Sequence, residues 1–346
     1  MDLLHPYLFI IMVQTSPKKR IEYIDLMKGA CITLVVLYHV YEHFDSEVID
    51  KALNNFRMPL YFFLSGLFFK KYSGFTDFVV RKTNKLIIPY LFFSIIPYCV
   101  LAPLFTDDYK DPMFVLMSII RPYNQPLWFL RALFVMYILY YGFKNLTDKY
   151  PRKTQLLLLA IITFINYIAS LFVCNIHYPD EFGTLFNFIT NTILAPIMAL
   201  PFMYAAEWVR MTNLLNRKMT VTQQIVSFVI SVSVLIIFAQ KSVNFESASF
   251  SSFYPFVYVS AFGGIYALAI LCQRINKLFF FSYLGRYSII VLGTHWVYLI
   301  AIRGIIEISH LSEFLIIIFL MPPTIWLFKK LFPYFTAQKD LLHWNK

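Results

Sequence analysis

The sequence has little charge, and this shortage excludes most soluble classes of protein. Only 14% of its 346 residues are charged, whereas 59% are hydrophobic. A soluble globular protein carries about 25% charged residues, which cover its surface in water. Disorder is excluded as well, because 37 Phe, 24 Tyr and 5 Trp residues are more aromatic surface than an unfolded chain leaves in water. The composition predicts a membrane protein.

Cysteines are also scarce, and several catalytic motifs are missing. The four cysteines lie in apolar stretches without paired spacing, so we expect neither a disulfide framework nor a metal site of the CxxC type. There is no G-x-S-x-G, Walker A, G-x-G-x-x-G or H-E-x-x-H motif to mark a hydrolase, nucleotide or zinc site. We therefore predict no bound metal and no resident cofactor. The cysteines are Cys31, Cys99, Cys174 and Cys272.

Long apolar segments fill most of the chain. A membrane-spanning helix needs about 20 mostly apolar residues, and ten windows of the sequence meet this need. We predict an all-α polytopic membrane protein with about ten transmembrane helices, joined by connections too short for a soluble domain. The windows are 24–43, 54–70, 83–105, 126–144, 154–173, 186–207, 222–240, 252–272, 284–303 and 312–332.

Lysine and arginine gather in alternate connections, and carboxylates dominate the others. Because positively charged loops stay in the cytoplasm, this alternation predicts that both termini are cytoplasmic. The expected organisation is a cytoplasmic N-terminal segment at 1–19, a ten-helix membrane domain at 20–332 and a cytoplasmic tail at 333–346. The basic residues are spread over separate segments, so the net charge of +11 does not indicate nucleic-acid binding.

The first window carries the densest set of ionisable residues, Asp25, Lys28 and His39. Such residues are costly within a membrane and usually face a cavity. Lys28 and His39 are eleven positions apart, so they project from one face of a helix, about 16 Å apart along its axis. Asp25 lies close enough to pair with Lys28. Lys28 alone fits a snorkelling lysine and His39 alone a structural histidine, but together they favour a polar tunnel.

A cluster of basic residues precedes the third window. Lys70, Lys71, Arg81, Lys82 and Lys85 lie in one connection. This cluster is typical of a cytoplasmic loop. It is equally typical of a site for a phosphate-rich ligand, because clustered lysine and arginine bind phosphate.

Two further windows contain polar residues that packing alone can explain. Arg57 lies at the outer end of the second window, and Ser65 and Gly66 permit close contact between helices. Glu207, near the inner end of the sixth window, is interpreted as a boundary residue. Although packing can explain them, we also include Arg57 and Ser65 among the candidate substrate-binding residues.

Trp128, Arg131 and His295 complete the candidate substrate-binding residues. Trp128 suits an aromatic anchor at the membrane interface or a platform that stacks on a sugar. Arg131 lies within its window and needs a partner such as Glu42 or Asp45. His295 lies in the middle of its window, where it is as readily structural as functional.

An ordered set of blocks makes the sequence resemble the acyltransferase 3 family of integral membrane acyltransferases. No single block is sufficient, but their order from residue 20 to about residue 330, combined with ten windows, is specific. The blocks are Arg20-x-x-x-x-Asp25-x-x-Lys28 with His39, Met58-Pro59-Leu60 with Leu64-Ser65-Gly66, Leu127-Trp128-Phe129, and Leu284-Gly285-Arg286-Tyr287-Ser288-Ile289 with His295.

The resemblance implies roles for particular residues. The family's basic residue, which ten residues separate from an essential histidine, maps onto Lys28 and His39. Its R-x-x-R-like motif maps onto Lys82-x-x-Lys85, with lysine at both ends here. Arg131 follows the tryptophan where some members carry a Glu-Glu pair, which is closer to the fucose-type O-acetylase branch.

The resemblance also implies an activity, the transfer of acetyl from cytoplasmic acetyl-CoA to a hydroxyl of a cell-envelope sugar or lipid-linked precursor. An enzyme of this kind lies in the cell inner membrane. We expect the phosphates of acetyl-CoA at Arg81, Lys82 and Lys85, while Asp25 orients Lys28. His39 then acts as a general base or as a transient acetyl acceptor.

Two alternatives remain open from the residues. Ten spans with a polar tunnel also suit a non-enzymatic transporter or flippase of a lipid-linked sugar, which would not need acetyl-CoA. The other alternative keeps the enzyme class and changes the acyl group to succinyl or another chain.

Overall fold

The computed structural model describes residues 20–42, 44–101, 125–174, 180–214, 219–239, 243–246, 248–249 and 253–344. Within these ranges the chain is helical, apart from connections and one isolated bridge between Asn244 and Ser249. The predicted N-terminal segment at 1–19 lies outside the described residues, as do the side chains of Cys99 and Cys174. Cys31 and Cys272 are buried free thiols.

Each of the ten predicted windows falls on a described helix. The prediction of an all-α polytopic membrane protein is thereby confirmed. The helices are α1 (Glu22–Tyr41), α2 (Glu47–Gly66), α3 (Phe75–Lys82), α4 (Ile88–Leu101), α6 (Trp128–Thr147), α7 (Arg152–Cys174), α8 (Asp180–Met211), α9 (Val221–Phe238), α10 (Pro255–Ile275), α11 (Phe279–Arg286), α12 (Ser288–Ile305) and α13 (His310–Leu331). A π-helix at Thr83–Ile87 joins α3 to α4, and a 3-10 turn at Gln125–Leu127 precedes α6.

Seven of the described helices are long and apolar enough to cross a membrane, namely α1, α7, α8, α9, α10, α12 and α13. The other predicted windows correspond to α2, α4 and α6. The structure describes only 14 residues of α4. α2 begins at Glu47 and includes Asp50, Lys51 and Arg57, so it starts seven residues before the predicted boundary. Helices shielded inside a bundle tolerate such polar residues, because they face other helices rather than lipid.

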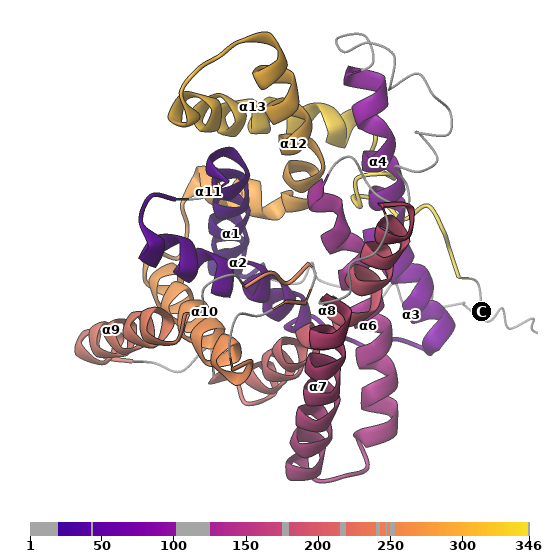
Figure 1. The fold of residues 1–346 in the computed structure, drawn as a ribbon, viewed down its shortest axis with the longest axis vertical. Coiled ribbons are helices and arrows are strands. Elements are labelled where there is room, and N and C mark those ends of the chain that lie inside the picture. Colours follow the sequence, from indigo (N-terminus) through magenta and orange to yellow (C-terminus); the bar gives the residue numbers. More distant parts are fainter. Residues whose placement is uncertain are drawn as a thin grey trace, which may run out of the picture.

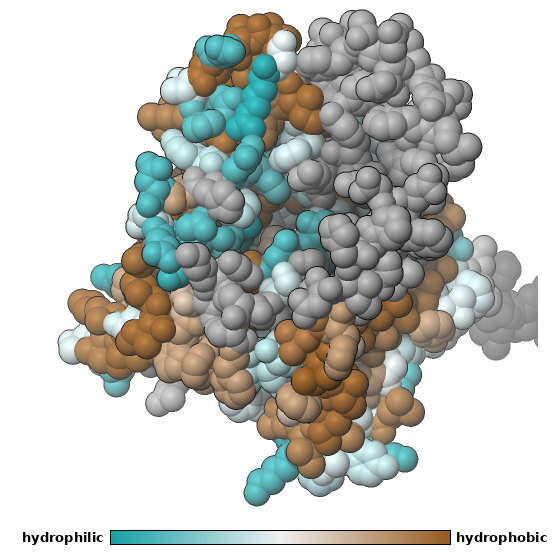
Figure 2. Space-filling model, viewed as in Figure 1, coloured by the Kyte–Doolittle hydropathy of each residue, from teal (hydrophilic) through white to brown (hydrophobic). Residues whose placement is uncertain are grey.

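α1 lies near the centre of the molecule and packs against α2, α10, α11, α12 and α13 (Figure 1). α7 and α9 lie at the periphery, where α7 packs on α8 and α9 packs mainly on α10. Figure 2 shows mainly apolar residues over α7 and α9, whereas hydrophilic residues gather above α9, over α1 and α2. Exposed side chains such as Phe164 and Ile165 on α7 and Ile237 on α9 form the surface that lipid would cover.

Glycine allows the closest approach of helices at two places. A Cβ atom on Gly29 of α1 would lie 1.8 Å from the carbonyl oxygen of Phe281, and one on Gly285 of α11 would lie 1.9 Å from the carbonyl oxygen of Asp25. Backbones approach this closely because neither glycine carries a side chain. A Cβ atom on Gly66 would likewise lie 2.9 Å from the backbone of Met203 of α8, which confirms the close contact predicted at this glycine.

Candidate functional site

Two cavities are lined by the same four helices, α1, α2, α6 and α12. The lysine cavity, named for Lys28, Lys82 and Lys85 in its wall, has a volume of about 350 Å³. The histidine cavity, named for His39, has a volume of about 810 Å³. Residues that line the lysine cavity include Lys28, Tyr61, Ser65, Phe68, Lys82, Lys85, Phe129, Tyr137, Ser288 and Leu292. Residues that line the histidine cavity include Tyr38, His39, Glu42, Asp50, Asn54, Arg57, Trp128, Asn244, Glu246 and Trp296.

A thin partition separates the two cavities. Arg57 and Tyr61 of α2 line opposite cavities four residues apart, which is about 6 Å along a helix. Trp128 and Phe129 are neighbours in α6 and also line opposite cavities. The rings of Tyr61 and Phe129 lie in contact, with centroids 5.4 Å apart. The single polar tunnel that we predicted is therefore wrong in detail, because aromatic rings divide it into two compartments.

Lys28 lies in the lysine cavity, but its predicted pairing with Asp25 is wrong. The Asp25 carboxylate accepts a hydrogen bond of 2.6 Å from Arg20 and lies 3.6 Å from Arg286. α11 brings Arg286 to this position through the glycine contact described above. The ammonium nitrogen of Lys28 lies 5.2 Å from the ring centroid of Phe68. Asp25 therefore joins α1 to α11, and its ion pairs are with Arg20 and Arg286 rather than with Lys28.

Lys82 is the most deeply buried of the three predicted phosphate ligands. It is 9% exposed, and its ammonium nitrogen lies 3.5 Å from the ring centroid of Tyr137. Lys82 forms no ion pair with any carboxylate of the described residues. Burial lowers the pKa of Lys82 to about 8. The lysine cavity thus contains a cation whose charge no carboxylate in the described part of the chain neutralises.

The other two predicted phosphate ligands already have acidic partners. Arg81 donates to Asp77 over 2.6 Å, and the hydrogen bonds from Ser73 and Arg81 lower the pKa of Asp77. Lys85 forms an ion pair of 2.9 Å with Asp340. The tail after α13 therefore folds back against the mouth of the lysine cavity, which the sequence did not predict.

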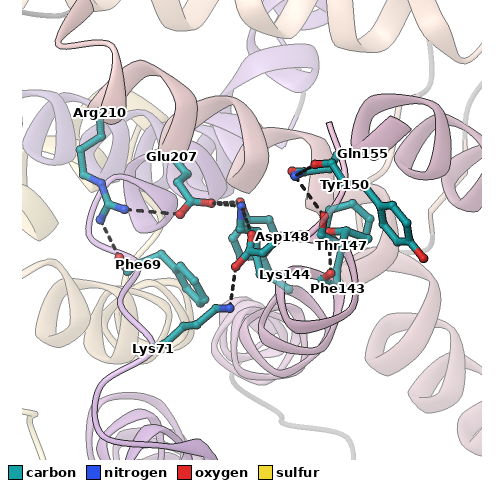
Figure 3. A network of polar contacts seen from close by, with 11 residues as sticks. Phe69, Lys71, Phe143, Lys144, Thr147, Asp148, Tyr150, Gln155, Glu207 and Arg210 are labelled. Atoms are coloured by element: carbon teal, nitrogen blue, oxygen red, sulfur yellow. Dashed lines mark hydrogen bonds and ion pairs between the residues drawn. The ribbon is translucent and has the colours of Figure 1, made fainter. Parts of the chain in front are cut away.

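A polar network fixes the loop between α2 and α3 at the same end of the molecule (Figure 3). Asp148 forms ion pairs of 2.7 Å with both Lys71 and Lys144. Glu207 accepts a hydrogen bond from Tyr140 and lies 3.4 Å from Lys144. Glu207 lies four residues before the end of α8, as a boundary residue does, and it also anchors α8 to α6.

His39 lies on the floor of the histidine cavity between two rings of α12. Its ring centroid is 5.4 Å from that of His295 and 5.2 Å from that of Trp296. His295 is 1% exposed, and its Nδ1 lies 2.8 Å from the carbonyl oxygen of Val291. His295 does not line either cavity, so the prediction that it binds substrate is not supported by its position.

Arg57 places a buried guanidinium in the same cavity as His39. The side chain is 8% exposed, and its guanidinium lies 3.7 Å from the ring centroid of Tyr38. Two of its nitrogens, Nε and Nη1, are buried and have no hydrogen-bond partner among the described residues. A cationic group held in this way is well placed to meet negative charge on a ligand or an intermediate.

The remaining predicted residues are distributed over different environments. Trp128 lines the histidine cavity, and Ser65 lines the lysine cavity. Arg131 lines neither, and its Nη1 donates to the hydroxyl of Tyr90 over 3.2 Å. Glu42 forms an ion pair of 3.0 Å with Arg303.

Asp50, Asn54 and Trp296 line the histidine cavity and were missed in the sequence. Asp50, Asn54, Arg57 and Tyr61 follow one another at steps of four, three and four residues, which places them on one face of α2. This periodicity was a usable signal, but the predicted start of the helix at residue 54 hid Asp50. Trp296 follows directly after His295 within an apolar window, and the sequence there gives no signal that its ring lines a cavity.

The chemistry available here is that of an imidazole, a guanidinium and ammonium groups. No cluster of three or more His, Cys, Asp or Glu side chains that would hold a metal ion occurs within the described ranges. The two compartments offer cations on one side of the partition and a histidine on the other. This arrangement suits two ligands that meet near His39.

Comparison with known proteins identifies the family of this chain. The family model of acyltransferase 3, described as an acyltransferase domain, matches residues 21–328. This range includes the four helices that line both cavities. A search of curated proteins finds no match.

Proposed function

Because this chain belongs to the acyltransferase 3 family, we propose that it transfers an acetyl group from cytoplasmic acetyl-CoA to a hydroxyl of a cell-envelope sugar or its lipid-linked precursor. The enzyme would lie in the cell inner membrane. The observation that supports this proposal is the pair of cavities on either side of one thin partition, with lysines in one cavity and His39 in the other.

The lysine cavity fits the donor. Acetyl-CoA carries phosphates at one end and a slender pantetheine arm at the other. Lys82 and Lys28 offer ammonium groups to the phosphates, and Lys85 does so in competition with Asp340. The aromatic and aliphatic walls, which include Phe68 and Tyr137, suit the arm.

The histidine cavity fits a carbohydrate acceptor. Trp128, Trp296 and Tyr38 supply aromatic faces, against which the C–H faces of sugar rings pack. Asn54 and Asp50 supply hydrogen-bonding groups for hydroxyls. The cavity is more than twice as large as the lysine cavity, which suits an acceptor bulkier than the pantetheine arm.

The proposed reaction is direct transfer with His39 as a general base. One ring nitrogen of His39 accepts the proton of the acceptor hydroxyl while the hydroxyl oxygen attacks the thioester carbonyl carbon. The π electrons of the carbonyl move to the carbonyl oxygen, where the guanidinium of Arg57 stabilises the negative charge. The carbon–sulfur bond then breaks, and His39 returns the proton to the CoA sulfur. Tyr61 and Phe129 must move apart for the thioester to reach His39.

The decisive experiment compares the mass of envelope glycans from cells with and without this protein. The expected result is the loss of one acetyl unit when the protein is absent. Purified protein should also bind acetyl-CoA. An unchanged glycan mass without binding of acetyl-CoA would replace the enzyme by a carrier of lipid-linked sugars. A mass difference of one succinyl unit would keep the enzyme class and replace acetyl by succinyl.

Donor binding should weaken with pH because of Lys82. Free Lys82 has a pKa of about 8, below the ordinary value for lysine, so it loses its charge as the pH rises through 8. The KM for acetyl-CoA is therefore expected to increase about tenfold for each further pH unit, measured from pH 7 to 9.5. Lys82→Arg should flatten this dependence, because arginine stays protonated. A KM that is constant across this range would remove Lys82 from donor binding.

A further inference from the structure

Only one of the two ring nitrogens of His295 forms a hydrogen bond with the described residues. Nδ1 lies 2.8 Å from the carbonyl oxygen of Val291. A carbonyl oxygen only accepts hydrogen bonds, so Nδ1 carries the proton and donates it. A neutral imidazole has a single N–H, so Nε2 presents a lone pair. Nε2 is buried and has no hydrogen-bond partner among the described residues.

The ring next to this lone pair belongs to His39. The two ring centroids are 5.4 Å apart, and the ring planes are inclined by 38°. At this separation a small rotation of either ring brings an N–H of one within hydrogen-bonding reach of a nitrogen of the other. Hydrogen bonds of catalytic groups are often long or misaligned before ligands bind and tighten in the loaded complex. Trp296 packs edge-on against His39 at 5.2 Å and limits its other movements.

We propose that His295 is the positioning residue for His39, an inference that rests on the proposed function. Nε2 of His295 accepts a hydrogen bond from one ring N–H of His39, which leaves the other nitrogen of His39 unprotonated and directed at the histidine cavity. When that nitrogen takes the proton of the acceptor hydroxyl, His39 becomes a cation and the bond to His295 strengthens as a charge-assisted hydrogen bond. His295 keeps its own proton on Nδ1 throughout.

The alternative is a structural role in which only the bond to Val291 matters. Two substitutions separate these roles, because each retains one of the two functional atoms. The amide nitrogen of His295→Asn lies near the position of Nδ1 and can still donate to Val291. The amide oxygen of His295→Gln reaches the position of Nε2 and can accept from His39. His295→Leu retains neither atom and reports whether the fold needs them.

The test measures transfer of radiolabelled acetyl from acetyl-CoA to glycan in membranes that contain each variant, per molecule of protein. His295→Gln is expected to retain kcat within about tenfold. His295→Asn is expected to lose about a hundredfold or more, with an unchanged KM for acetyl-CoA, because the lysine cavity is intact. Both should accumulate like the wild type, as should His295→Leu if the bond to Val291 is not needed for folding.

The outcomes distinguish this inference from the proposed function. If the wild type transfers acetyl and His295→Asn is at least as active as His295→Gln, the positioning role is overturned and the proposed function stands. If KM rises together with the loss of kcat, or if only the variants that lack the Val291 bond fail to accumulate, His295 is structural. If wild-type membranes transfer no acetyl at all, the proposed function fails and this inference fails with it.

Discussion

Replacing His39 with alanine is expected to reduce acetyl transfer by at least about a thousandfold. A positioned general base contributes about 10²–10⁴ in rate, and no other imidazole lines either cavity in the described part of the chain. The measurement is the rate of radiolabelled acetyl incorporation into glycan by membranes with matched amounts of protein. Binding of acetyl-CoA should be unchanged, because the donor phosphates meet the lysine cavity, about 16 Å away along α1.

A conservative substitution distinguishes the role of His39 as a base from a role in filling space. His39→Gln preserves most of the volume between His295 and Trp296 but has no basic nitrogen. It should fold as the wild type does and be as inactive as His39→Ala. Retained activity in His39→Gln would show that the imidazole only fills the cavity floor, and the proposed mechanism would be abandoned.

The wild type should also distinguish the two chemical roles that the sequence left open. Direct transfer predicts that protein incubated with radiolabelled acetyl-CoA, without acceptor, carries no covalent label. A transient acetyl-imidazole predicts label that hydroxylamine removes and that is absent in His39→Gln. Recovery of such label would change His39 from a base into an acyl carrier and would leave the family activity intact.

The helices of this protein were predictable from sequence for a physical reason. Lipid offers no hydrogen-bond partners to the backbone, so a spanning segment must be a continuous apolar helix, and such a segment is visible in a single sequence. The boundary of α2 was harder to predict, because Asp50 and Lys51 are charged and resemble a loop. Their tolerance depends on neighbouring helices that the local sequence does not reveal.

The pairing of charged side chains was less predictable than their presence. Asp25 was expected to pair within its own helix, but its partner on α11 is Arg286, which a glycine contact brings near. Arg131 was expected to need a carboxylate, and one of its contacts is a hydrogen bond to Tyr90 of α4. Arg286 and Tyr90 are distant in sequence from the residues they meet, and the packing of whole helices decides these contacts.

The division of the site into two cavities could not be read from the sequence at all. Lys28 and His39 lie on one helix, as the spacing indicated, and the sequence correctly associated them. Whether a passage between them is open depends on the rings of Tyr61 and Phe129, which come from different helices and meet at 5.4 Å. An aromatic residue in an apolar window gives no sign of whether it faces lipid, core or a passage.

Replacing Arg57 with methionine is expected to lower the acetyl transfer rate by about 10²–10³, the usual cost of losing one group that stabilises an oxyanion. The same substitution should leave the thermal midpoint of the purified protein in detergent unchanged or raise it. A buried cation without a carboxylate partner costs stability, and an apolar side chain of similar volume often relieves that cost. Among the described residues, the guanidinium of Arg57 stacks on the ring of Tyr38 and forms a hydrogen bond with its side chain, so the contacts that methionine removes are those with one aromatic side chain.

Opposite effects on rate and stability are what distinguish a functional arginine from a structural one. If Arg57 were retained for folding, Arg57→Met would accumulate poorly and lose its thermal midpoint, and its activity per folded molecule would stay near that of the wild type. Arg57→Lys supplies the matched control, because it keeps the charge and loses the planar fork of donors. It should recover part of the rate and show none of the gain in thermal midpoint expected of Arg57→Met. A faster or unchanged rate in Arg57→Met would remove Arg57 from the reaction.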